Sequence, residues 1–94
     1  MNERRRERTA AFVREVIPEF FQRECELLPG VFLTVLHVEV VESGVRANVF
    51  VSVFPDSAKE AVAKELDLRE NKATQFIRMR LGTKYSPAVR FTVH

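Results

Sequence analysis

Residues 73–84 read Ala73-Thr74-Gln75-Phe76-Ile77-Arg78-Met79-Arg80-Leu81-Gly82-Thr83-Lys84, and this stretch joins helical apolar spacing to a run of positive charge. Its apolar residues can share one helix face while its basic residues take the other. Gly82 stands where a left-handed residue would end such a helix. Beyond Glu70 the chain has no acidic residue. The stretch is therefore predicted to be a helix that carries a local positive field, presented by the rest of the chain.

A second helix is predicted at the start of the chain, where Asn2 and Glu3 can open it. Pro18 lies inside this segment, and because it lacks a backbone donor it should bend the helix without ending it. Leu28-Pro29-Gly30 then ends the segment by turn chemistry. The face that this helix buries follows the i, i+4, i+7, i+8 pattern and consists of Val13, Ile17, Phe20 and Phe21.

The middle of the chain has the composition of a β-hairpin. Residues 31–41 are rich in β-branched and apolar side chains, and residues 46–54 alternate between apolar and other residues. Glu42-Ser43-Gly44 separates the two runs and supplies a tight turn. In the first run, one face is expected to carry Phe32, Thr34, Leu36, Val38 and Val40. In the second run, one face is expected to carry Ala47, Val49, Val51 and Val53.

The third helical region is predicted to begin with a capping box between Ser57 and Glu60, directly after Pro55. Its apolar rhythm breaks over residues 67–71, so the helix should bend or restart there before the basic helix. Residues 88–93 alternate as a last strand. The order is helix, strand, strand, helix, helix, strand, which predicts an α+β two-layer domain with a three-stranded sheet packed on helices.

Charge is segregated along the 94 residues, although the net charge is only +2. Residues 1–14 hold five Arg against two Glu, which gives +3. Residues 15–68 hold four basic and ten acidic residues, which gives −6, and residues 69–94 hold six basic residues against Glu70, which gives +5. Basic ends around an acidic middle predict one positive and one negative face on a single domain.

Motifs for catalysis or cofactor binding are missing from the sequence. Cys25 is the only cysteine, and the two histidines, His37 and His94, are far apart. There is no Gly-rich phosphate loop and no nucleophile with a base beside it. We therefore expect no enzyme activity, no cofactor, no metal and no small-molecule substrate. Without a long apolar run or a signal segment, the expected location is the cytoplasm, away from membranes.

With this order of elements, the chain resembles the bacterial ribosome-binding factor A family over nearly its whole length. The resemblance is strongest in the hairpin, from Val38-Glu39-Val40 through Val45-Arg46-Ala47-Asn48-Val49-Phe50-Val51. It is also strong in Ala73-Thr74-Gln75-Phe76-Ile77-Arg78 with Leu81-Gly82, followed by Pro87 and Phe91. The resemblance implies a type II KH-like fold and one domain over residues 1–94, without the separate C-terminal tail of the family.

One departure from the family pattern concerns the helices. The family has an Ala-x-Gly interruption between them, and here Gln75 stands at the Gly position. Without Gly, the kink loses its permissive residue. The kink is expected either to move to residues 67–71 or to be lost, in which case the helix runs straight through Ala73.

The resemblance implies a non-enzymatic assembly factor, expected to act as a monomer. Such a factor binds the small (30S) ribosomal subunit and its rRNA and aids late maturation and 5′-end processing of that rRNA. Arg78 has a second interpretation, as a structural bridge to the acidic helix predicted to begin at Ser57. Two other functions stay open: a generic KH-like RNA-binding module, or a protein–protein interaction domain that uses the acidic middle. The predicted RNA-binding residues are Lys72, Ala73, Thr74, Gln75, Arg78, Arg80 and Lys84, with Arg4, Arg5, Arg6 and Arg8 as a second set.

Overall fold

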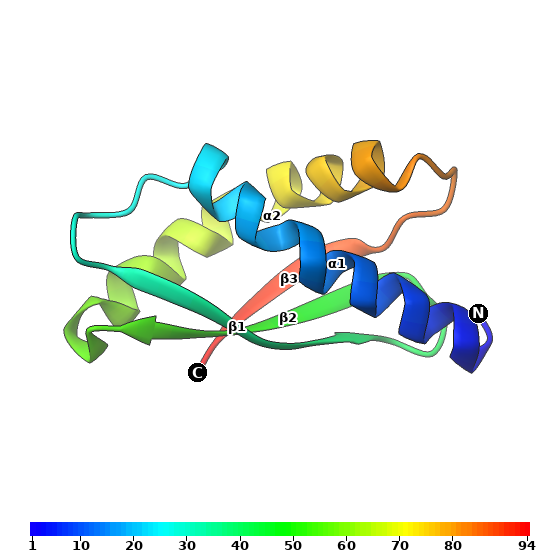
Figure 1. Ribbon diagram of the computed structural model, residues 1–94, viewed down its shortest axis with the longest axis horizontal. Coiled ribbons are helices and arrows are strands. Elements are labelled where there is room, and N and C mark those ends of the chain that lie inside the picture. Colours follow the sequence, from blue (N-terminus) through cyan, green and yellow to red (C-terminus); the bar gives the residue numbers. More distant parts are fainter.

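Three strands form one mixed sheet, and two long helices cover one of its faces (Figure 1). The computed structural model describes all 94 residues. The central strand β2 pairs antiparallel with β1 and parallel with β3. This is the α+β two-layer architecture predicted from the sequence. The elements are α1 (Glu3–Glu24), β1 (Phe32–Val40), β2 (Arg46–Phe54), the 3-10 turn η1 (Asp56–Ala58), α2 (Lys59–Leu81) and β3 (Ala88–Val93).

The core lies between the helices and the sheet, and Phe20 is its centre. The Phe20 ring is fully buried and lies 5.5 Å from the ring of Phe76 and 6.4 Å from that of Phe91, centroid to centroid. All four predicted core residues of α1 are buried, and so are Ala47, Val49 and Val51 of β2. The helical and two-residue periodicities of the sequence therefore identified the inward faces of α1 and β2 correctly.

The predicted faces of β1 are correct for the end of the strand and wrong for its beginning, because the strand contains a β-bulge. Val35 pairs with Val51, but the next residue of β2, Phe50, pairs with His37, so Leu36 has no partner. The extra residue reverses the alternation from that point. Val38 and Val40 face the core as predicted, whereas the side chains assigned to the same face earlier in the strand, Phe32, Thr34 and Leu36, are exposed.

Helix α2 runs without interruption from Lys59 to Leu81, so the predicted restart within residues 67–71 does not occur and the helix passes straight through Ala73. Polar side chains within and just after this segment hold the helix against the free edge of β3. Glu70 accepts a hydrogen bond from the Phe91 backbone N–H at 2.9 Å. Thr74 Oγ1 accepts one from the Val89 N–H, also at 2.9 Å. The break in apolar rhythm therefore marks a row of edge-strand contacts and no helix end.

The predicted capping box at the start of this helix is also absent. Neither η1 nor α2 has a side-chain hydrogen bond at its N-cap. Instead, the chain enters α2 through the 3-10 turn, in which the Ala58 N–H donates to the Pro55 carbonyl at 3.0 Å. The Lys59 N–H donates to the Asp56 carbonyl in the same turn, and Ser57 and Glu60 are both exposed.

Helix α1 begins as predicted, with the Asn2 side chain accepting a hydrogen bond from the Arg5 N–H at 2.8 Å, and it continues through Pro18 to Glu24. Pro18 is exposed and removes one helical hydrogen bond. We expect Pro18→Ala to raise the free energy of unfolding, by at most about 3 kcal/mol. Urea unfolding followed by circular dichroism measures it. A loss above about 2 kcal/mol would show instead that core packing needs proline at this position.

Candidate nucleic-acid interface

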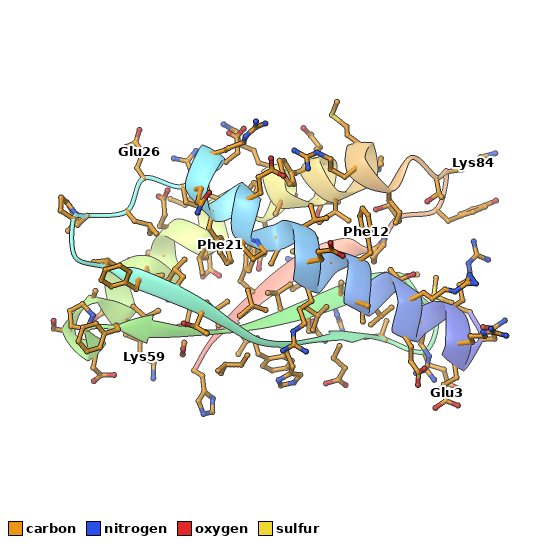
Figure 2. The ribbon with its side chains drawn as sticks, in the orientation of Figure 1. Glu3, Phe12, Phe21, Glu26, Lys59 and Lys84 are labelled. Carbon is orange, nitrogen blue, oxygen red and sulfur yellow. The ribbon has the colours of Figure 1, made fainter.

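The structure brings Lys84, from the first predicted set, to the same end of the molecule as the second set near the start of α1. Figure 2 shows Lys84 at the same end as the start of α1, while Lys59 lies at the opposite end. Arg5 and Lys84 line one open cavity of about 310 Å³, called here the Arg5–Lys84 pocket. No acidic side chain lines it. Its lining residues are Met1, Arg5, Ser43, Gly44, Val45, Lys84, Tyr85 and Ser86.

Parallel pairing of β2 with β3 brings together the turn and the last connection that line this pocket. Arg46 and Ala88 are register partners at the start of the two strands, so the residues before each strand lie side by side. The Ala88 N–H donates to the Val45 carbonyl at 2.9 Å and ties the β3 entry to the β1–β2 turn. Gly82, at φ 67°, ends α2 in the predicted left-handed conformation and turns the chain toward that point.

Sequence reasoning missed the turn residues and the pair Tyr85 and Ser86. One signal could have found them: the hairpin turn and the last connection both lead into strands that a β-α-β crossover would make parallel. Parallel strands begin at the same end of the sheet. The connection that carries Lys84 therefore had to lie beside the turn that carries Gly44.

The basic residues of α2 do not form one cationic stripe. Lys72 and Arg78 are six residues apart, which places them about 120° apart around the helix. Lys72 lies in a shallow groove that also includes Glu24 of α1, whereas Arg78 is exposed and makes no ion pair. The bridge considered for Arg78, to the first part of α2, does not form, and a different pair joins the helices: Arg80 donates a hydrogen bond to Glu19 of α1.

The other predicted positions on α2 divide between contact with solvent and contact with the sheet. Gln75 is exposed, but Ala73 is fully buried and Thr74 is half-buried with its hydroxyl bonded to β3. Ala73 and Thr74 therefore position the helix and do not present side chains to a ligand. At the N-terminus Arg4, Arg5 and Arg8 are exposed, while Arg6 is half-buried and its Nε has no hydrogen-bond partner.

The Arg80–Glu19 pair stabilises the contact between the two helices. The guanidinium of Arg80 also lies over the Phe76 ring, 4.6 Å from its centroid, which adds a cation–π contact. The hydrogen bond from Arg80 lowers the pKa of Glu19 below its ordinary value of 4.5. Arg80 is thus engaged in structure, unlike Arg5 and Lys84, which form no ion pair.

A pH-dependent difference in stability follows from the lowered pKa of Glu19. The stabilisation that it reflects is present above pH 4.5 and is lost as the pH falls through the lower pKa of the folded state. At neutral pH we expect Arg80→Gln to be less stable than the unaltered protein, and the gap should narrow on acidification. Urea unfolding over a pH series measures it, with Arg78→Gln as the control. A gap that does not change with pH would contradict this assignment.

Other sites for ligands are sparse. No group of three or more His, Cys, Asp or Glu side chains is placed to hold a metal ion. No helix has the length and apolar character needed to cross a membrane.

Cys25 is half-buried, and burial raises the pKa of its thiol to about 11, so the thiol is protonated at neutral pH. His37 is exposed on β1, and its ring stacks on that of Phe50 with 4.2 Å between the centroids.

Comparisons with known proteins agree on one family. The family model described as ribosome-binding factor A matches residues 5–93. No curated protein matches the chain. A crystal structure of ribosome-binding factor A from Thermus thermophilus is 20% identical, covers 94% of each chain and has a TM-score of 0.77. A second similar structure is a homology model of the Thermus thermophilus factor, fitted into a cryo-EM map of its complex with the 30S subunit. Its sequence is 23% identical to this chain, with 88% coverage of each chain and a TM-score of 0.74. These likenesses confirm the predicted fold.

Proposed function

Because the chain belongs to the ribosome-binding factor A family, we propose that it binds the small (30S) ribosomal subunit and aids late maturation of that subunit. The proposal includes help with 5′-end processing of the small-subunit rRNA. The family match spans nearly all of the chain, and a structurally similar Thermus thermophilus protein has been placed in a map of its complex with the 30S subunit. The protein would act by binding alone, without a chemical step of its own.

The observation that carries this proposal is the Arg5–Lys84 pocket. Two cationic side chains from opposite ends of the chain converge there without an acidic neighbour in the lining. Lysine and arginine side chains that neutralise phosphates release counterions and so supply affinity that does not depend on RNA sequence. Exposed Arg4 and Arg8 on the same helix extend the positive surface. Selection of the 30S subunit would then depend on the shape of the rRNA.

A test of the maturation role uses the host organism. Deleting the gene should cause small-subunit rRNA with an unprocessed 5′ extension to accumulate, measured by primer extension on purified subunits. A plasmid copy of the unaltered gene should restore the mature end, and a copy with Lys59→Gln should do so equally, because Lys59 lies far from the pocket (Figure 2). Normal proportions of mature 5′ ends in the deletion strain would refute the processing role.

A further inference from the structure

The Arg5–Lys84 pocket contains a polar group that the proposed function does not use. Ser86 lines the pocket, and its Oγ is buried without any hydrogen-bond partner. A buried hydroxyl that lacks a partner is costly, and such groups are rare in folded proteins. Serine has three staggered χ1 positions, so a rotation about this bond can turn the hydroxyl toward the pocket. Ser86 is therefore an available donor beside two cations.

The loop around Ser86 has an exposed side that a ligand can reach and a buried side that is anchored to the fold. Its internal hydrogen bond runs from Thr83 Oγ1 to the Tyr85 carbonyl at 3.0 Å. Behind it, Pro87 is fully buried and the Ala88 N–H is bonded to Val45. The loop can thus present Lys84, Tyr85 and Ser86 from a fixed base.

Tyr85 adds an aromatic surface next to the cations. Its side chain is 72% exposed, which leaves most of the ring free to meet a ligand from solvent. Proteins that bind single-stranded RNA combine a positive groove with aromatic rings on which bases stack. Cation, aromatic ring and hydroxyl occur here in three consecutive residues, 84–86.

We propose that the Arg5–Lys84 pocket is a subsite for one nucleotide of single-stranded RNA. Arg5 and Lys84 neutralise a backbone phosphate, Ser86 Oγ donates to one of its non-bridging oxygens, and the neighbouring base stacks on Tyr85. The cavity volume of about 310 Å³ is at the lower end of small-molecule sites, which suits a nucleotide better than an isolated oxyanion. The inference deepens the proposed function, since it takes the partner to be RNA.

Binding of a fluorescein-labelled, single-stranded RNA octamer, followed by anisotropy, tests the subsite. Ser86→Ala should weaken binding by about tenfold through loss of a hydrogen bond to a charged group. Tyr85→Leu should weaken it by about fivefold or more through loss of stacking. Lys84→Gln should weaken binding and also lower the log–log salt slope by roughly 0.7. The control, Lys59→Gln, removes the same charge at the opposite end of the molecule and should bind like the unaltered protein.

Two results would overturn the subsite. One is an unaltered affinity for the octamer in both Ser86→Ala and Tyr85→Leu, which would show that the pocket attracts RNA only through its positive charge. The other is inorganic phosphate that competes with the octamer as well as a dinucleotide does, which would make the ligand a bare anion. Melting curves show whether each variant is folded. If Ser86→Ala loses stability, the variants at Tyr85 and Lys84 still test the subsite, because both side chains are exposed and their replacement should leave the fold intact.

Sedimentation with purified 30S subunits separates this inference from the proposed function. If the unaltered protein fails to bind 30S subunits while the variants still lose affinity for the octamer, the subsite is supported and the ribosomal role is refuted. If 30S binding holds while Ser86→Ala and Tyr85→Leu bind the octamer normally, the ribosomal role stands and the subsite falls.

Discussion

Reversing the charge of both pocket cations, in Arg5→Glu with Lys84→Glu, is expected to abolish binding to the 30S subunit with little change in melting temperature. The two side chains line one pocket, so the double variant replaces two attractions for phosphate with two repulsions at a single place. Each lost phosphate contact should lower the log–log salt slope by roughly 0.7–0.9. Neither side chain forms an ion pair within the protein, so its loss removes no folded-state partner.

The matched control for this variant is Lys59→Glu with Lys64→Glu. Both lysines are exposed on the first half of α2, and neither forms an ion pair. The control makes the same change in net charge far from the pocket, so it should retain most of the binding. Equal losses in the two double variants would show that affinity follows net charge alone and would contradict a localised interface.

Phe20→Ala is expected to cost about 3–5 kcal/mol of unfolding free energy. The Phe20 ring is 0% exposed and contacts rings from α1, α2 and β3, so removing it leaves a cavity where all three elements meet. The total free energy of unfolding of a small domain is only about 5–15 kcal/mol. The melting temperature should therefore fall by at least about 12 °C, because each kcal/mol shifts it by roughly 4–8 °C in a domain of this size.

Phe54→Ala is the control for the core variant. It deletes the same ring from a side chain that is 68% exposed at the end of β2, where it pairs across the strands with Phe32. The expected loss is below about 1 kcal/mol, the upper value for a cross-strand pair. If both Phe variants lost the same stability, Phe20 would not be the centre of the core. Differential scanning calorimetry on both proteins gives the comparison.

Local patterns in the sequence predicted most of the fold. Alternation in β2 and β3, and helical spacing in α1, each point to one buried face, since these periods follow directly from backbone geometry. The bulge at Leu36 could not be predicted in this way. It is a property of pairing between two strands, and the first half of β1 carries apolar side chains on both sides, so either register looked acceptable there from the sequence.

The candidate interface was harder to predict because it depends on contacts between distant segments. The basic segment of α2 looked like a single cationic surface, yet Arg80 is engaged by Glu19, 61 residues earlier in the chain. The break in apolar rhythm over residues 67–71 suggested a helix end, because the sequence does not show that Glu70 accepts a hydrogen bond from the Phe91 N–H of β3. The N-terminal arginines and Lys84 were predicted separately. Parallel pairing of β2 with β3 places Lys84 beside the hairpin turn, and Arg5 of α1 lines the same pocket.

Sedimentation of the purified protein with 30S subunits from its own host, over a series of salt concentrations, tests the central proposal most directly. We expect the protein to pellet with 30S subunits at low salt, more than with an equal mass of free rRNA, and to be released steeply as salt rises. The Arg5→Glu, Lys84→Glu variant should stay in the supernatant throughout. Equal binding to free rRNA, or pelleting of the variant with 30S subunits at physiological salt, would contradict the account.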